Sequence, residues 1–143
     1  MKIEKILFPT DFAPRSKNAR EHALYLAGSL GAPVYLLHAI EPLKYDEVDE
    51  EIRDFYKTLE AQMSEKMTAE REIFDKNGLS VYTDIIIGPR WRVINTYAEE
   101  KGIDLIIMGS HGIRAESGEV SVGTTSHKVM FSSPCPVLIV RHG

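Results

Sequence analysis

Short apolar runs alternate with amphipathic stretches along most of this 143-residue chain, and the alternation restricts the possible folds more than any other feature. The apolar runs are predicted to be strands, at residues 5–8, 34–40, 81–87, 105–108 and 137–140. Between them, apolar residues recur at helical spacing and predict helices at residues 14–30, 46–76, 89–101 and 125–130. Nearly continuous apolar strands that alternate with helices predict a parallel sheet with helices on both faces.

We therefore expect an α/β fold: a single doubly wound, five-stranded parallel sheet in the strand order 3-2-1-4-5. The chain is long enough for one core and too short for two, so residues 1–143 are expected to form a single domain. In this strand order the chain reverses direction between the first and fourth strands, and open α/β sheets bind ligands at such a switch point. The loops 9–12 and 109–112 would then lie side by side.

The first two predicted helices carry apolar stripes that indicate their buried faces. The stripe of the first helix is Ala19, Ala23, Leu26, Ala27 and Leu30, and that of the second is Val48, Ile52, Phe55, Leu59, Met63 and Met67. Glycines 31 and 102 are expected to end the first and third helices. The acidic run at residues 46–51 is predicted to be the solvated start of the second helix, where negative charge is favoured by the helix dipole.

The fourth apolar run ends abruptly in a glycine-rich segment that contains Gly109, Gly112 and Gly123. Glycine lets backbone N–H groups approach a ligand closely, and the helix predicted near Thr125 would add unpaired N–H donors. Together these features favour an anion site, most naturally one for phosphate. The alternative is that the glycines serve only the geometry of a turn and a loop.

Composition excludes several classes of protein. The formal net charge of −4 argues against a general binder of nucleic acid or of anionic membranes. No apolar segment approaches membrane-spanning length, and the first residues lack the apolar core of a signal peptide, so a cytoplasmic location is expected. The lone Cys135 excludes an intramolecular disulfide, and an inert thiol is the simpler interpretation.

Three common nucleotide or phosphate classes do not fit the sequence. A dinucleotide-binding fold needs glycines directly after the first strand, where this chain has Pro9, Thr10 and Asp11. No P-loop sequence is present. A phosphorylated receiver domain needs an aspartate after the third strand, where Gly88 and Pro89 stand instead.

Five segments in order along the chain form a recognisable pattern: Pro-Thr-Asp-Phe at 9–12, Leu-His-Ala-Ile at 37–40, Ile-Met-Gly-Ser-His-Gly at 107–112, Gly-Thr at 123–124 and the apolar ending at 134–140. With these segments the chain resembles the universal stress protein family from end to end. The resemblance implies the same five-stranded sheet and, as in many members, binding of ATP, with AMP or ADP as alternatives and Mg²⁺ as a companion ion. The family's glycine pattern has nine residues before the last glycine, whereas this chain has ten, at 113–122.

The resemblance also implies a set of site residues. Pro9, Thr10, Asp11 and Ala39 would line the adenine and ribose end, and the ribose and phosphates would lie against Met108, Gly109, Gly112, Gly123, Thr124 and Thr125. A second interpretation of Asp11, compatible with the first, is an N-cap of the first helix. A structural role is expected for His38.

The function expected from these features is that of an ATP-binding stress-response or regulatory protein that acts through nucleotide-dependent conformation and association. No convincing general base is visible, so at most weak ATP hydrolysis is expected. The alternatives are a slow ATPase or phosphoryl-transfer protein, and a nucleotide-free dimeric interaction module suggested by the longer loop. The expected partner is a second copy paired through the edge strand Val137, Leu138, Ile139 and Val140.

Overall fold

The computed structural model of the chain describes residues 2–42, 49–110 and 124–141. The strands are β1 (Ile6–Pro9), β2 (Val34–Ile40), β3 (Val81–Ile87), β4 (Leu105–Gly109) and β5 (Val137–Val140). The helices are a short 3₁₀ turn η1 (Pro14–Ser16), α1 (Lys17–Leu30), α2 (Glu50–Lys76), α3 (Arg90–Lys101) and α4 (Thr124–Ser132). All five predicted strands are therefore present: β2, β3 and β5 have the predicted bounds, β4 is one residue longer, and β1 is shifted by one residue.

The strands form one five-stranded sheet in the order β3-β2-β1-β4-β5, and every neighbouring pair is parallel. The predicted strand order is confirmed. The central strand β1 aligns Ile6 with Val34 of β2 on one side and with Leu105 of β4 on the other. β2 lies on one side of β1 and β4 on the other. Because all three strands are parallel, their carboxyl ends lie at the same edge of the sheet.

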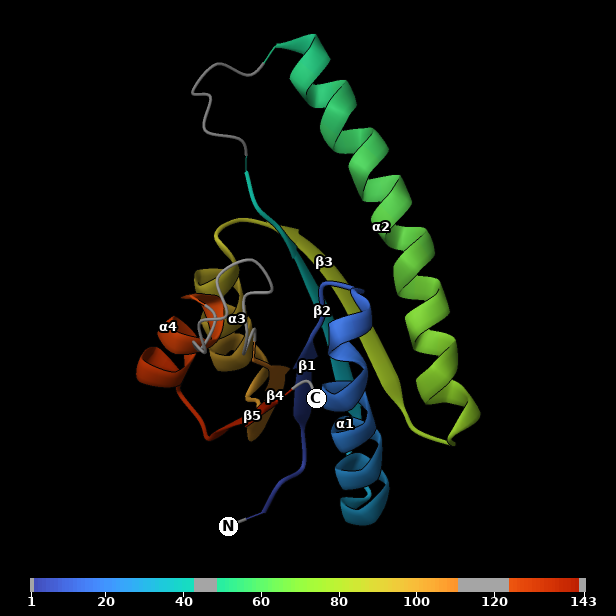
Figure 1. The fold of residues 1–143 in the computed structure, drawn as a ribbon, viewed down its shortest axis with the longest axis vertical. Coiled ribbons are helices and arrows are strands. Elements are labelled where there is room, and N and C mark those ends of the chain that lie inside the picture. Colours follow the sequence, from blue (N-terminus) through green and yellow to red (C-terminus); the bar gives the residue numbers. More distant parts are fainter. Residues whose placement is uncertain (1, 43–48, 111–123, 142–143) are drawn as a thin grey trace.

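Helices cover both faces of the sheet, as predicted. Figure 1 shows α1 and α2 on one face and α3 and α4 on the other. Ile6 and Phe8 of β1 are fully buried in the core under α1 and α2, while Leu7 between them is buried under α3 and α4. This alternation is what a strand requires when apolar layers lie on both sides of it.

Left-handed glycines end two of the helices. Gly31 and Gly102 have φ values of 65° and 64°, and their backbone N–H groups bond to carbonyls of the last turn of α1 and α3. An L side chain rarely adopts such a φ, so glycine at these positions stops the helix as predicted. In α1 the buried residues are Ala19, Ala23 and Ala27, whereas Leu30 at the end of the predicted stripe is 47% exposed.

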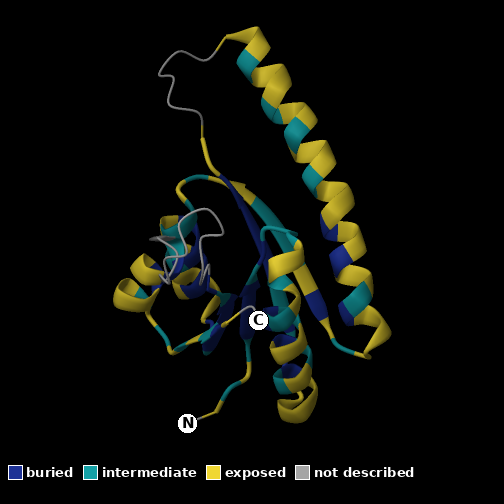
Figure 2. Cartoon of the chain, in the orientation of Figure 1, coloured by how far each residue is buried: buried dark blue, intermediate teal, exposed yellow. Residues whose placement is uncertain are grey.

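Helix α2 differs from the prediction in two ways. It begins at Glu50 rather than near residue 46, because Asp49 is its N-cap and accepts a hydrogen bond from the N–H of Ile52 at 2.9 Å. Residues 46–48 lie outside the described part of the chain. The helix also extends well beyond the sheet (Figure 1), and Figure 2 shows that its buried residues lie in the half nearer its C-terminus.

The reason is the length of α2 relative to the sheet it covers. Its 27 residues rise much farther than a seven-residue strand, so only part of the helix can lie over apolar side chains. Met67, Glu70 and Phe74 are buried, whereas Phe55 in the predicted apolar stripe is 48% exposed. The predicted amphipathic helix is therefore present, but only Met67 of its stripe is buried; Ile52, Leu59 and Met63 are partly buried, and residue 48 lies outside the described part of the chain.

Candidate functional site

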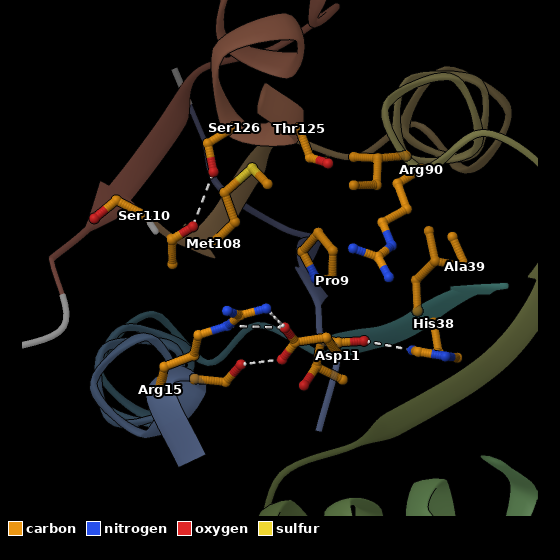
Figure 3. A pocket seen from close by; sticks show the side chains of 15 residues that line it. Pro9, Asp11, Arg15, His38, Ala39, Arg90, Met108, Ser110, Thr125 and Ser126 are labelled. Atoms are coloured by element: carbon orange, nitrogen blue, oxygen red, sulfur yellow. Dashed lines mark hydrogen bonds and ion pairs between the residues drawn. The ribbon is translucent and has the colours of Figure 1, made fainter. Parts of the chain in front are cut away.

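A pocket lies at the carboxyl ends of β1, β2 and β4, where the fold predicts a ligand site. Figure 3 shows its side chains converging from strands on one side and from η1, α3 and α4 on the others. The lining residues are Pro9, Thr10, Asp11, Arg15, Ser16, Leu37, His38, Ala39, Arg90, Ile94, Met108, Gly109, Ser110, Thr125 and Ser126. Segments more than 100 residues apart in the sequence therefore meet in one place.

The structure brings together most of the residues predicted for the site. Seven of the ten line the pocket: Pro9, Thr10, Asp11, Ala39, Met108, Gly109 and Thr125. Gly112 and Gly123 lie outside the described residues. Thr124 begins α4, but it is not among the lining residues, and the structure does not describe its side chain.

The turn after β1 is held by its own polar side chains. Thr10 Oγ1 accepts the N–H of Phe12 at 3.0 Å, and Asp11 Oδ1 accepts the N–H of Ala13 at 2.9 Å. Phe12 has φ 62°, in the left-handed region, and this sharp turn directs the Thr10 and Asp11 side chains toward the pocket. Asp11 is not the N-cap of the first helix, since the N-cap positions of η1 and α1 are Ala13 and Ser16.

The carboxylate of Asp11 is strongly hydrogen-bonded. Besides the N–H of Ala13 it accepts Ser16 Oγ at 2.8 Å and the Arg15 guanidinium at 2.8 and 3.2 Å. Burial raises the pKa of Asp11, but these hydrogen bonds and the charge of Arg15 outweigh burial and lower the pKa to about 2. Asp11 is therefore an anion at neutral pH, and its oxygens are already occupied as acceptors.

His38 is a buried residue that supports the same turn. Its Nδ1 lies 2.7 Å from the carbonyl oxygen of Thr10, and because a carbonyl only accepts, Nδ1 carries the proton. The ring also packs against Phe12 at a tilt of 33°, with centroids 4.6 Å apart. Burial and the nearby charge of Arg90 lower the pKa of His38, although the bond to Thr10 opposes the shift. The neutral form predominates at pH 7, which agrees with the structural role predicted for it.

Neither backbone conformation nor contacts among the described residues require glycine at position 109. Its φ is outside the left-handed region, so its conformation does not require glycine. A Cβ placed there would meet Ala19 Cβ at 3.9 Å and the carbonyl oxygens of Arg15 and Val140 at 4.0 Å, which are ordinary contacts. Gly88 differs, because a Cβ there would lie only 2.8 Å from Val93 Cγ2. Packing thus explains glycine at position 88, whereas neither packing nor backbone conformation explains it at position 109.

Two buried serines lie beside Gly109. Ser126, in the first turn of α4, donates to the carbonyl oxygen of Gly109 at 2.9 Å and so ties the start of that helix to the end of β4. Ser110 is 7% exposed, and its Oγ has no hydrogen-bond partner among the described residues. A buried hydroxyl without a partner is costly, so its presence in a pocket lining favours a ligand or water there.

Two cations of the pocket were not predicted from the sequence. Arg15 lies next to Asp11 on η1, and Arg90 is the first residue of α3. Figure 3 shows them on opposite sides of the pocket, with Arg90 on the side of His38 and Ala39. No sequence motif marks either arginine. Each stands at the start of a helix that follows a strand, where this fold class binds its ligands, and that position was the one sequence feature that could have predicted them.

The described residues give no sign of a built-in metal site or of a membrane span. Within residues 2–42, 49–110 and 124–141, no three His, Cys, Asp or Glu side chains are grouped so that they could hold a metal ion. In the same part of the chain, no helix combines the length and the apolar character needed to cross a membrane.

Comparison with known proteins places this chain in a family. The model of the universal stress protein family matches residues 2–141, so the chain belongs to that family. The universal stress protein YxiE of Bacillus subtilis is 31% identical, over 97% of this chain and 99% of the relative. The universal stress protein MJ0577 of Methanocaldococcus jannaschii is 29% identical, over 96% of this chain and 94% of the relative.

Solved structures show the same architecture. A structure of hypothetical protein MJ0577 matches with a TM-score of 0.83 and 31% identity, over 100% of this chain and 99% of that chain. The universal stress protein UspA of Lactobacillus plantarum matches with a TM-score of 0.87, over 99% of each chain, and at 23% identity it supports the fold alone.

Proposed function

We propose that this chain binds ATP in the pocket at the carboxyl ends of β1, β2 and β4, and that it acts as a stress-response or regulatory protein. The observation that carries the proposal is Gly109, whose missing side chain neither its φ nor its packing explains. It lies where the first turn of α4 faces the pocket through Thr125 and Ser126. A helix start with free N–H groups beside an open backbone suits a phosphate.

The two ends of the pocket differ in chemistry as a nucleotide would require. Leu37, Ala39 and Ile94 provide apolar surface near the ends of β2 and α3, where a base would be favoured. Near Gly109, hydroxyl groups predominate: Ser110, Thr125 and Ser126. In this proposal Gly112, Gly123 and Thr124 complete the phosphate end, and Mg²⁺ could accompany the triphosphate.

Two structural neighbours support an adenine nucleotide. One is described as a universal stress protein in complex with cAMP, with a TM-score of 0.76 and 18% identity. Another, from Archaeoglobus fulgidus, is described as a complex with dAMP, with a TM-score of 0.69 and 19% identity. Both ligands carry one adenine and one phosphate, so for this chain they favour the adenine class over a particular number of phosphates.

Within this proposal, nucleotide occupancy acts by changing conformation and association, and hydrolysis is at most weak. A general base works best with a pKa near the operating pH, whereas Asp11 in the pocket has a pKa of about 2. Its oxygens also accept hydrogen bonds from Arg15, Ser16 and Ala13. Asp11 is therefore suited to hold the turn in place, and it is a weak base for taking a proton from water.

We also propose a homodimer through β5. This strand is an edge of the sheet, and Leu138 on it is 36% exposed. Unpaired backbone groups and apolar side chains on an edge invite pairing with another strand. A second copy meets that need with one self-complementary patch about a two-fold axis. The surface would consist of Val137, Leu138, Ile139 and Val140.

The experiment that tests nucleotide binding has two steps. Mass spectrometry of the denatured, freshly purified protein identifies any small molecule carried through purification, and calorimetric titration then measures the affinity for ATP, ADP, AMP and cAMP. The proposal expects a carried adenine nucleotide or saturable binding of ATP at one site per chain. If the folded protein carries none and gives no heat with any of the four, the proposal is wrong.

A further inference from the structure

Arg90 is a pocket cation that is weakly engaged by the rest of the protein. Its Nε lies 3.9 Å from Glu41 Oε1, beyond hydrogen-bond distance, and both side chains are about half exposed. An exposed ion pair of this length holds a guanidinium only loosely. Arg15 at the other side of the pocket is different, because Asp11 binds it through two hydrogen bonds. The guanidinium of Arg90 is therefore available to a ligand.

The surroundings of Arg90 place it at the apolar end of the pocket. Figure 3 shows the side chain extending from α3 into the pocket on the side of His38 and Ala39. Ile94 lies one turn farther along the same helix and also lines the pocket, so the two residues share one helix face. The proximity to Glu41, two residues beyond Ala39, confirms the position next to the end of β2.

The phosphate-like end lies elsewhere. Gly109 lies beside the backbone carbonyl of Arg15, and its own carbonyl accepts a hydrogen bond from Ser126 Oγ. The end where we place the phosphates is therefore formed by the backbone of Arg15 and Gly109 and by the hydroxyls of α4. A cation at the opposite, apolar end has no phosphate to neutralise. In the proposed complex it would lie beside the flat face of the base.

We propose that the guanidinium of Arg90 stacks on the face of the adenine ring and clamps the base against the apolar wall of Ala39 and Ile94. This proposal rests on the proposed nucleotide function and adds a residue that recognises the base. A guanidinium is planar and weakly hydrated, so it stacks on aromatic faces better than an ammonium group does. Such stacking strengthens binding whatever the number of phosphates.

The test compares three ligands on four proteins. Adenosine, AMP and ATP are titrated calorimetrically into the wild type, Arg90→Ala, Arg90→Lys and Arg15→Ala, and thermal unfolding checks that each variant is folded. Arg90→Ala is expected to weaken all three ligands by about the same factor, roughly tenfold. Arg90→Lys keeps the positive charge but replaces the planar guanidinium with an ammonium group, so its ligand affinities are expected to be close to those of Arg90→Ala. Arg15→Ala is the matched control, expected to weaken ATP more than adenosine.

Different results would overturn the stacking role. If the loss in Arg90→Ala grows from adenosine to ATP and Arg90→Lys restores affinity, Arg90 binds phosphate instead. If Arg90→Ala binds all three ligands as the wild type does, Arg90 does not contact the nucleotide, while the proposed function stands. If the folded wild type binds none of the three, the nucleotide function fails and the base clamp fails with it.

Discussion

Arg20 and Glu70 join α1 to α2 through a two-pronged ion pair: Arg20 Nε donates to Glu70 Oε1 at 2.7 Å, and the second nitrogen donates to Oε2 at 2.9 Å. The Glu70 side chain is 5% exposed and that of Arg20 is 23% exposed. Glu70 lies within the limited part of α2 that is buried, so the pair fixes how the long helix lies on the domain.

We expect Glu70→Ala to lower the free energy of unfolding by about 3 kcal/mol, because Arg20 would keep its charge in a partly buried place without a partner. Urea denaturation measures the change. Asp75→Ala is the control on the same helix, since it removes an exposed pair with Arg71 at 3.5 Å and should cost less than about 0.5 kcal/mol. Equal losses in the two variants would contradict the role of the buried pair.

Gly109→Ala and Gly88→Ala should have opposite effects. A methyl group at position 109 has room in the protein, so we expect an unchanged midpoint of thermal unfolding and an ATP affinity reduced about tenfold or more. A methyl group at position 88 collides with Val93, so we expect a loss of about 1–3 kcal/mol in stability. Calorimetric titration and thermal unfolding of both variants check the two expectations. Wild-type ATP affinity in Gly109→Ala would refute the phosphate end as placed here.

The contribution of Asp11 to stability should depend on pH. The pKa of Asp11 is about 2 in the folded protein, against an ordinary value of 3.8 for an aspartate, so the unfolded chain binds a proton first as the pH falls. The stabilisation is then complete above about pH 5 and is lost as the pH falls toward 2. We expect Asp11→Asn to be about 1–2 kcal/mol less stable than the wild type at pH 6.

Urea denaturation of both proteins between about pH 3 and pH 6 measures this difference. It should narrow as the pH falls, because the wild-type carboxylate becomes protonated in the unfolded state and then in the folded one. A difference that stays constant over this range would show that the charge of Asp11 does not contribute.

Arg90→Ala should raise the pKa of His38. Burial is the main cause of its lowered pKa, and the charge of Arg90 lowers it further. Removing that charge leaves the burial, so we expect a partial rise that leaves the pKa below 6.5. NMR titration of the His38 ring protons measures it, and Arg92→Ala, whose guanidinium lies over Trp91, is the control expected to leave the pKa unchanged. A wild-type His38 pKa in Arg90→Ala would place Arg90 away from that end of the pocket.

A single lysine on β5 should separate the proposed dimer. We choose Leu138→Lys because Val137 and Ile139 pack partly against the core under α3 and α4, so lysine there would also damage the fold. The control is Ile86→Lys on the opposite edge strand β3, since Ile86 is 37% exposed and Leu138 is 36% exposed. Analytical ultracentrifugation should show a dimer for the wild type and Ile86→Lys, and a monomer for Leu138→Lys. A monomeric wild type at micromolar concentration would remove the proposal.

The local chemistry of the chain was sufficient to predict its elements. The bounds of β2, β3 and β5 follow from apolar runs, and the ends of α1 and α3 follow from Gly31 and Gly102. These signals act within a few residues, so they can be read without knowing what lies nearby in space. The strand order and the meeting of the loops after β1 and β4 also followed, because the crossover rules for parallel sheets leave few arrangements.

Tertiary contacts decided the rest. Which part of α2 is buried depends on where the sheet ends, so the apolar stripe alone could not show that Phe55 is 48% exposed. Arg15, Arg90 and Ser126 reach the pocket because of how η1, α3 and α4 lie against the sheet, and no local pattern states that direction. Periodicity and capping depend on residues that are neighbours in the sequence. A pocket depends on side chains that are distant in the sequence and that packing brings together.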